Sequence, residues 1–255
     1  MSHQQEKAKA FRKLHVVGDP LVLYNVWDPV SAKAVTSAGA KAVGTSSWAV
    51  AEALGYSDGE QTPLGLVIDN LKRIVESTQR PVTVDLEGGY GEDPESVGKT
   101  ISLAIGAGAI GCNLEDSIAS IGELREAGDQ VSRLRSAREV AKAAKIDFFI
   151  NARCDVFFQG PADKHNGALV KKAIERAHIY AEAGADGLFL PGLSEIQLIA
   201  QIAEQSPIPL NILVNGPSPS VSLLSENGVA RVSYGGTPYA ETIEAFEEAA
   251  RKAYS

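Results

Sequence analysis

The feature that most constrains the fold of this sequence is an alternation of short apolar runs with longer helical patterns. Eight runs are near-continuously apolar, as expected of parallel strands that are buried on both faces. These runs are LVLYNVWD from Leu21, KAVGTSS from Lys41, PVTVDLE from Pro81, IGCNLED from Ile110, FFINARCD from Phe148, GLFLPG from Gly187, LNILVN from Leu210 and RVSYGG from Arg231. The segments between them show the i, i+3, i+4 apolar spacing of amphipathic helices. The pattern predicts a (β/α)8 TIM barrel with a parallel eight-stranded core.

The chain is long enough for one barrel and contains no linker or low-complexity break. It has 255 residues, of which 44 % are hydrophobic. We therefore predict a single domain over residues 1–255, with a polar N-terminal extension over 1–18 and a C-terminal helix over 237–255 as a candidate subunit interface. A doubly wound open sheet is the alternative, but it needs a Gly-rich turn after its first strand, and Asn25–Pro29 offers none.

Charge and cysteine content argue against several classes of function. The chain carries 24 basic and 32 acidic residues, a net charge of -8, so it would repel a nucleic-acid backbone. No Lys/Arg block suggests a membrane-binding surface, and no run approaches the roughly 18 apolar residues of a membrane helix. The two cysteines, Cys112 and Cys154, and a polar N-terminus without the apolar region of a signal peptide predict a reducing, cytoplasmic location.

Acidic residues gather where the third and fourth apolar runs end, which is the edge of a barrel that holds active sites. Asp85 and Glu87 are two residues apart, so both can point inward, and Glu115 ends the next run. Three convergent carboxylates are unfavourable in a closed site unless a cation neutralises them, and all-oxygen ligands favour Mg²⁺. The alternative is that these acids cap helices or pair with Arg153.

Other strands offer groups that could bind a substrate at such a site. Arg153, in the fifth run, matches a carboxylate bidentately, unless it forms a structural ion pair with Glu115 or Asp155. Ser46 and Ser47 end the second run and could hold a carboxylate or enolate oxygen. No lysine ends a strand and the histidines lie elsewhere, which disfavours a Schiff-base aldolase, a His-based triad and a zinc site.

Several motifs together resemble the phosphoenolpyruvate mutase/isocitrate lyase superfamily, from about residue 10 to about residue 245. The motifs are GTSSW from Gly44, ALGYSD from Ala53, VDLEGGYG from Val84, NLED from Asn113 and NAR from Asn151. The Asp-x-(Asp/Glu)-x-Gly-Tyr-Gly stretch is the most specific of them. The resemblance implies an enzyme that makes or breaks a C–C or P–C bond next to a pyruvate-enolate-like intermediate held against Mg²⁺.

The resemblance also assigns metal-binding roles. Asp85 would bind the metal directly, and Asp58, Glu87 and Glu115 would hold metal-bound waters. Many members of the family carry Asp where this chain has Glu87. The longer side chain should still reach the metal through a water.

For the substrate, the resemblance implies a small 2-oxo-carboxylate, or an enol phosphate or phosphonate. Ser46 and the two residues after it, Ser47 and Trp48, would bind this molecule together with Arg153. Ser46, Arg153 and Asp58 are the predicted catalytic residues.

Two departures from the family pattern affect the expected activity. Ser117–Gln130 corresponds to the family's gating loop, where isocitrate and methylisocitrate lyases carry Lys-(Lys/Arg)-Cys-Gly-His. This segment has no Cys, Lys or His, so we predict that both activities are absent and that the segment is a mobile lid. Only Thr237–Ser255 follows the last strand, where many members have helices that swap between subunits. The resemblance still implies a homodimer or homotetramer.

Two other functions stay open at this point. One is a phosphate-gripping barrel aldolase or isomerase, with Asn215-Gly216 and Gly235-Gly236 as the grip. The other is a non-catalytic protein that binds an oxo acid without turning it over.

Overall fold

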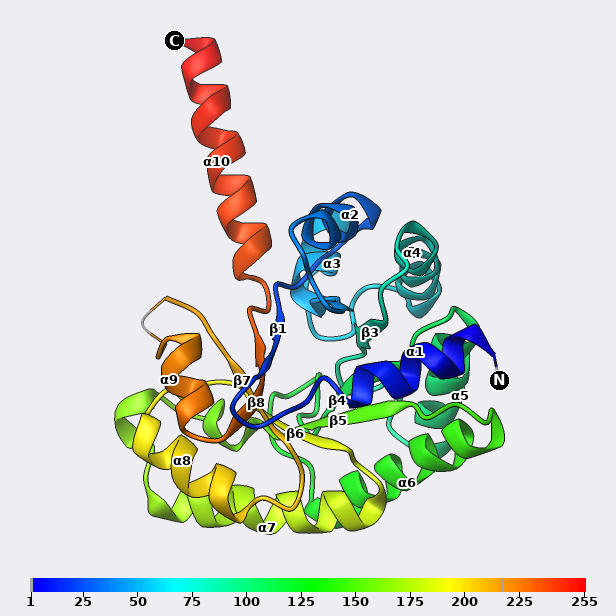
Figure 1. Ribbon diagram of the computed structural model, residues 1–255, viewed down its shortest axis with the longest axis vertical. Coiled ribbons are helices and arrows are strands. Elements are labelled where there is room, and N and C mark those ends of the chain that lie inside the picture. The colour runs from blue at the N-terminus through cyan, green and yellow to red at the C-terminus, as the bar shows by residue number, and fades with distance from the viewer. Residues whose placement is uncertain (1, 217) are drawn as a thin grey trace.

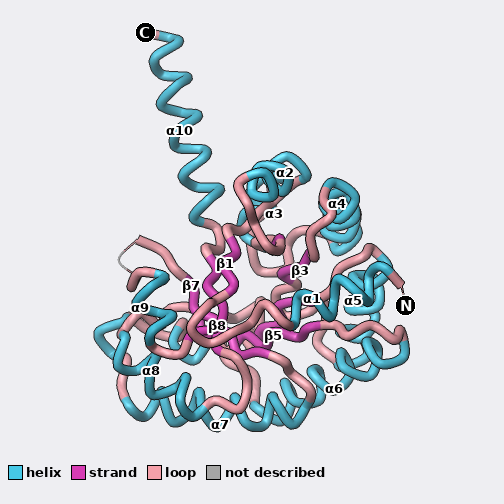
Figure 2. Tube along the Cα trace, in the orientation of Figure 1, coloured by secondary structure: helices cyan, strands magenta, loops and turns pink. Residues whose placement is uncertain are grey.

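Eight parallel strands surround a central axis, and most helices pack around them (Figures 1 and 2). The structure is a computed structural model that describes residues 2–216 and 218–255. The strands are β1 (Leu21–Leu23), β2 (Val43–Gly44), β3 (Val82–Asp85), β4 (Gly111–Glu115), β5 (Phe149–Arg153), β6 (Gly187–Leu190), β7 (Leu210–Leu213) and β8 (Val229–Ser233). They pair in the order β1-β8-β7-β6-β5-β4-β3-β2, and a parallel bridge between Val26 and Thr45 joins the two ends of this order. The predicted (β/α)8 barrel is confirmed.

The helices begin where the sequence supplies caps. They are α1 (His3–Arg12), α2 (Pro29–Ser37), α3 (Ser47–Leu54), α4 (Leu64–Ser77), α5 (Pro94–Gly106), α6 (Ala127–Ala143), α7 (Gly167–Ala183), α8 (Ile196–Gln205), α9 (Val221–Glu226) and α10 (Thr237–Tyr254). Asp28 and Asp93 each accept a hydrogen bond from the third residue of the helix that follows, with proline at the first position. No helix in the described part of the chain has the length and apolar character needed to cross a membrane.

The N-terminal extension contains a helix that packs against the barrel. Phe11 on α1 is fully buried, with its ring edge-on to the ring of Phe149, at 5.5 Å between centroids. Arg12 forms ion pairs with Asp147 and Asp186, at 2.8 Å each. Because Asp147 and Phe149 lie at the start of β5, α1 covers the end of the barrel opposite to the carboxyl ends of the strands.

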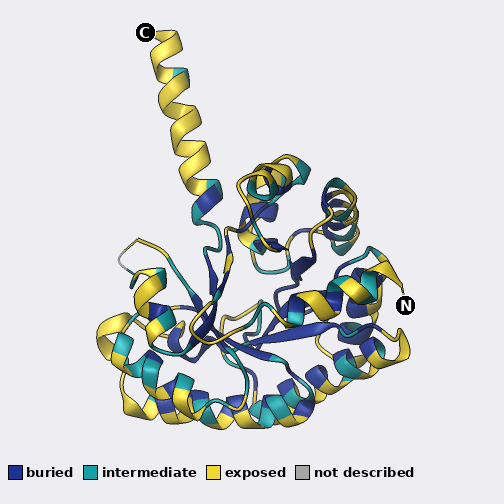
Figure 3. Cartoon of the chain, in the orientation of Figure 1, coloured by how far each residue is buried: buried dark blue, intermediate teal, exposed yellow. Residues whose placement is uncertain are grey.

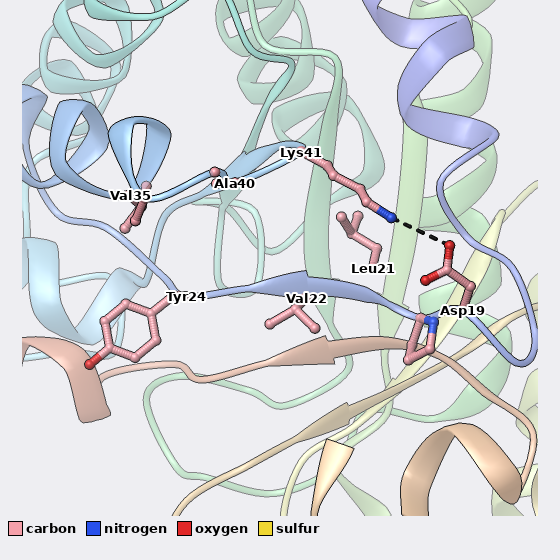
Figure 4. A pocket seen from close by; sticks show the side chains of 10 residues that line it. Asp19, Leu21, Val22, Tyr24, Val35, Ala40 and Lys41 are labelled. Carbon is pink, nitrogen blue, oxygen red and sulfur yellow. Dashed lines mark hydrogen bonds and ion pairs between the residues drawn. The ribbon is translucent and has the colours of Figure 1, made fainter. Parts of the chain in front are cut away.

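The last helix, α10, projects away from the barrel (Figures 1 and 3). Pro238 is its only buried residue, and Phe246 is 72 % exposed. Tyr239 in the first turn of α10 packs on Trp27 and Trp48, but the apolar face farther along the helix does not pack on its own barrel. As a result, Val22 and Tyr24 on the outer side of β1 stay partly exposed, and they line a groove of about 410 Å³ that Val35 of α2 borders (Figure 4).

We propose that α10 of one subunit packs into the groove of another, since an apolar helix face and an uncovered strand are both exposed. Phe246→Asp is then expected to convert a homo-oligomer into a monomer, as measured by light scattering at micromolar concentration. Leu103→Asp, at an exposed position on α5, is the matched control and should leave the mass unchanged. A monomeric wild-type protein would contradict the proposal.

Candidate active site

A pocket of about 300 Å³ opens at the carboxyl ends of the barrel strands. Six residues predicted from the sequence line it, namely Ser46, Ser47, Trp48, Asp58, Asp85 and Arg153. Gly235 and Gly236, predicted as part of a phosphate grip, also line the pocket. The lining residues to which the sequence analysis gave no role are Asn25, Asn113, Phe158, Phe189, Pro191, Leu213 and Ser233. Glu87 and Glu115, both predicted at the metal, do not line this pocket.

The serines belong to the first turn of α3. Ser46 is the N-cap, and its Oγ accepts a hydrogen bond of 3.4 Å from a backbone N–H of that turn. The positive end of the helix dipole therefore faces the pocket. The backbone N–H of Ser47 lies 3.4 Å from Oδ2 of Asp85. Trp48 packs against Gly236 so closely that a Cβ there would collide with the indole ring, which only glycine avoids.

Asp85 is the carboxylate in the pocket that is best suited to bind a cation. Its Oδ1 is buried and has no hydrogen-bond partner, which is unfavourable for a charged acceptor. Within residues 2–216 and 218–255, no group of three or more His, Cys, Asp or Glu side chains could hold a metal ion. Mg²⁺ usually keeps several waters and binds one or two carboxylates. The residues thus fit Mg²⁺ held directly by Asp85, with waters between the ion and other acids.

Asp58 is the second acid of the pocket. Burial raises its pKa, and the nearby Asp85 carboxylate raises it further, while Ser47 and Arg153 oppose the shift. Two carboxylates that repel each other in this way favour a cation between or beside them.

Hydrogen bonds hold the carboxylate of Glu87. It accepts from the backbone N–H groups of Gly59 and Glu60, at 2.7 and 2.5 Å, and from the hydroxyl of Tyr90 at 2.9 Å. Burial, followed by repulsion from Asp58, raises the pKa of Glu87 to about 7. Glu87 therefore holds the backbone next to Asp58 in place, and its role at metal-bound waters, like that of Glu115, stays a prediction.

Arg153 forms both of the ion pairs that the sequence left as alternatives. Its Nε and Nη2 donate to the two oxygens of Asp155, at 2.6 and 3.0 Å, and its Nη1 lies 2.6 Å from Glu115. These carboxylates raise the pKa of Arg153 although burial opposes the shift, and burial raises the pKa of Glu115. A guanidinium has five N–H donors. Since Asp155 engages only the Nε donor and one Nη2 donor, donors on Nη1 and Nη2 remain for a ligand carboxylate.

Comparison with known proteins identifies the family. Residues 11–254 match the family model described as phosphoenolpyruvate phosphomutase. The chain belongs to this family. The crystal structure of a putative phosphonomutase from Burkholderia cenocepacia J2315 is 47 % identical, has a TM-score of 0.96, and covers 98 % of this chain and 99 % of that one. The resemblance to the phosphoenolpyruvate mutase/isocitrate lyase superfamily is thus confirmed.

Two curated relatives are lyases in the wide sense. The 2-methylisocitrate lyase of Escherichia coli K12 is 31 % identical, over 83 % of this chain and 71 % of the relative. The oxaloacetate decarboxylase of Pseudomonas entomophila L48 is 29 % identical, over 92 % of this chain and 81 % of the relative. The family thus supports an enzyme of the lyase or mutase type. Because a 2-methylisocitrate lyase is among the relatives, the comparisons do not support our exclusion of that activity.

The segment that corresponds to the family's gating loop is short. The last four residues of Ser117–Gln130 belong to α6, and a bridge between Ser117 and Leu124 closes the remainder into a hairpin. The hydroxyl of Ser117 donates to Asp155 at 2.6 Å, which connects the hairpin to the carboxylate that holds Arg153. No residue of this hairpin lines the pocket.

We expect the tip of this hairpin, residues 118–123, to exchange amide hydrogens quickly without ligand and several-fold more slowly with Mg²⁺ and oxalate. The tip is largely exposed, and a lid that excludes water from an enolate would close over the ligand. Hydrogen–deuterium exchange with mass spectrometry measures this, and α7 provides an internal reference. Equal protection in both states would refute the lid.

Part of the pocket lining is apolar. It consists of the side chains of Phe158, Phe189, Leu213, Pro191 and Trp48, and the ring of Phe158 packs on the guanidinium of Arg153, at 5.4 Å. Among the described residues, Arg153 is the only Lys, Arg or His that lines the pocket. The pocket thus combines two acids and one cation with apolar side chains.

Half of the predicted phosphate grip is already engaged. Oδ1 of Asn25 accepts hydrogen bonds from the backbone N–H groups of Tyr234 and Gly235, at 2.9 Å each. The N–H of Asn215 donates to Ser218 at 3.0 Å. The amides of Asn215 and Gly235 therefore have no hydrogen left for a phosphate, which weakens the phosphate-gripping alternative.

Proposed function

We propose that the protein is a Mg²⁺-dependent enzyme that cleaves a C–C bond next to the 2-oxo group of a small oxo acid, by decarboxylation. One observation carries this proposal: the described lining of the pocket joins two acids and a single guanidinium to several apolar side chains. The similarity to an oxaloacetate decarboxylase supports it.

The residues of the chain would hold the oxo acid in one orientation. The remaining N–H donors on Nη1 and Nη2 of Arg153 match the carboxylate next to the 2-oxo group. Ser46 and Ser47 present the first turn of α3 to the same region. When bound at Asp85, Mg²⁺ would supply Lewis-acid stabilisation of the charge that develops on the 2-oxo oxygen.

The apolar part of the lining favours loss of carbon dioxide. In the proposed orientation, a carboxylate on the third carbon lies against Phe189, Leu213 and Pro191, which offer it no cation. When the C–C bond to this carboxylate breaks, its electron pair moves into the enolate and neutral CO₂ leaves. Charge thereby moves away from the apolar residues toward Arg153 and the metal site, so the site stabilises the transition state more than the substrate. Solvent then protonates the enolate carbon.

The lining of the pocket also disfavours the other reactions of the family. Transfer of a phosphoryl group requires cations around its oxygens, and the pocket has no second Lys, Arg or His among the described residues. Cleavage of a methylisocitrate-type substrate requires an acid to protonate the leaving carbanion, and no Cys, His or Lys among them lines the pocket either.

A turnover screen tests the proposal. Purified protein with Mg²⁺ is offered oxaloacetate, phosphonopyruvate, phosphoenolpyruvate, an alkylmalate and 2-methylisocitrate. We expect CO₂ release from oxaloacetate, and EDTA should abolish it. The rate should exceed the rate measured with Mg²⁺ and the Asp85→Asn variant, which serves as the control for the reaction of the free metal ion. Turnover of the phosphonate or of 2-methylisocitrate instead would contradict decarboxylation. Binding of oxalate without any turnover would favour the non-catalytic alternative.

A further inference from the structure

Asn113 lies beside the carboxylate that would hold the metal. In the register of β3 and β4, Asn113 is the direct partner of Asp85. It is 5 % exposed and lines the pocket. Its Oδ1 accepts two hydrogen bonds, from Nδ2 of Asn151 at 2.9 Å and from Nη2 of Arg231 at 3.2 Å.

Arg231 decides which way the Asn113 amide points. A guanidinium can only donate, so the amide atom that faces Arg231 must be the oxygen. The nitrogen must then lie on the other side of the amide. It makes no hydrogen bond to the described residues, and it is not one of the buried polar atoms left without a partner. Asn113 thus presents an N–H₂ donor to the pocket next to Asp85.

Arg231 itself is an unusual residue for a barrel interior. It is 1 % exposed, its Nε donates to Ser233 at 3.4 Å, and its Nη1 has no partner. Among the described residues, no carboxylate lies within ion-pairing distance of Arg231, and Asp85 supplies its main electrostatic attraction. Burial lowers the pKa of Arg231 to about 10, so it stays charged at neutral pH. A buried charge without an ion pair is unfavourable for folding alone, which points to a role in the site.

We propose that Asn113 donates from Nδ2 to an anionic oxygen of the bound oxo acid, and that Arg231 is the positioning residue that fixes this donor. The oxygen is one that lies beside the metal carboxylate Asp85, on a carboxylate or enolate group. The proposal rests on oxo-acid binding in the pocket and does not depend on which bond the enzyme breaks.

The first test is Asn113→Asp, which keeps the shape of the side chain. The new carboxylate still accepts from Asn151 and gains an ion pair with Arg231, so the metal-free protein should melt no lower than wild type. The group that faces the pocket becomes an acceptor. Calorimetry with oxalate at saturating Mg²⁺ should show at least tenfold weaker binding, about 1.4 kcal/mol. Asn227→Asp, at the C-cap of α9 and the far end of the barrel, is the matched control and should bind like wild type.

The second test is Arg231→Met, which removes the charge at similar volume. The oxygen of Asn113 keeps its bond from Asn151, and Ser233 keeps its bond to Asn211, so no acceptor is orphaned. We expect an unchanged or higher melting temperature together with several-fold weaker oxalate binding, because the Asn113 amide is free to turn. Arg138→Met is the control: it removes a partly buried arginine paired with Asp186, so it should lower the melting temperature without changing affinity.

The outcomes separate this inference from the proposed function. If wild type does not bind oxalate with Mg²⁺, the oxo-acid site itself is wrong and both proposals fail. If wild type binds and a folded Asn113→Asp protein binds within twofold of it, this inference alone is overturned. A lower melting temperature with unchanged affinity in Arg231→Met would show that Arg231 has only a structural role.

Discussion

Replacing Asp85 by asparagine is expected to abolish Mg²⁺-dependent oxalate binding. The variant keeps the side-chain shape and an acceptor for the N–H of Ser47, but it loses the charge on the buried oxygen that has no partner. Asp85 is the acid that fits direct contact with the ion, and Asp58 is the only other carboxylate among the described residues that line the pocket. Calorimetry should show an affinity reduced by more than a hundredfold, above about 2.7 kcal/mol.

The same variant has a second expected result. The neutral amide in Asp85→Asn would no longer repel Asp58, whose pKa is raised by burial and by the Asp85 carboxylate. The metal-free variant should therefore melt at the same or a higher temperature than wild type, as a functional site predicts. Asp69→Asn, at an exposed position on α4, is the control and should change neither quantity. Unchanged oxalate affinity in Asp85→Asn would remove Asp85 from the site.

The elements of the barrel could be predicted because each has a local signal. Apolar runs over β3 and β4 and the proline-started caps at Asp28 and Asp93 are readable in the sequence, and the structure has them. That Asp85 and Arg153 line the pocket could be predicted from their positions at the ends of strands. Asn113 lies two residues before Glu115, and Ser233 lies two residues after Arg231. Strand alternation could therefore also have predicted Asn113 and Ser233 as pocket residues.

Glu87 shows where strand alternation fails. β3 ends at Asp85, and the backbone at Glu87 adopts a left-handed conformation, with φ at 51°. The rule that residues two apart point the same way holds only within a strand, so it does not place Glu87. Tyr90 has a φ of 56°, and this second turn brings its hydroxyl back to Glu87. Such turns depend on partners distant in sequence, namely the amides of Gly59 and Glu60.

Contacts across the barrel were equally out of reach. Arg231 and Asn113 are 118 positions apart, and Asn25 meets the N–H of Gly235 over 210 positions. No local sequence pattern in either segment predicts these pairs, since each residue lies in an ordinary apolar run. The direction of α10 was also undetermined, because an amphipathic helix reveals that it has an apolar face and not which subunit covers it.

Arg153→Lys is expected to weaken oxalate binding although it keeps the positive charge. In wild type, two of five guanidinium N–H donors serve Asp155, Nη1 forms an ion pair with Glu115, and donors on Nη1 and Nη2 remain for the ligand. An ammonium has only three donors, which the two buried carboxylates would engage. Loss of a charge-assisted pair should raise the dissociation constant by about tenfold to 150-fold, or about 1.5–3 kcal/mol.

Calorimetry at saturating Mg²⁺ measures this, with Arg80→Lys as the control because Arg80 is exposed just before β3, at the opposite end of the barrel. Oxalate, which mimics the enolate in shape and charge, should bind wild type more tightly than pyruvate does, and acetate should bind worst because it cannot chelate the metal. The order of affinity of the three ligands depends on chelation of the metal, whereas the loss of affinity in Arg153→Lys depends on the two-pronged geometry of the guanidinium. If oxalate binds no better than acetate, or if Arg153→Lys retains full affinity, the pocket does not recognise a 2-oxo-carboxylate, and Arg153 serves only its ion pairs with Asp155 and Glu115.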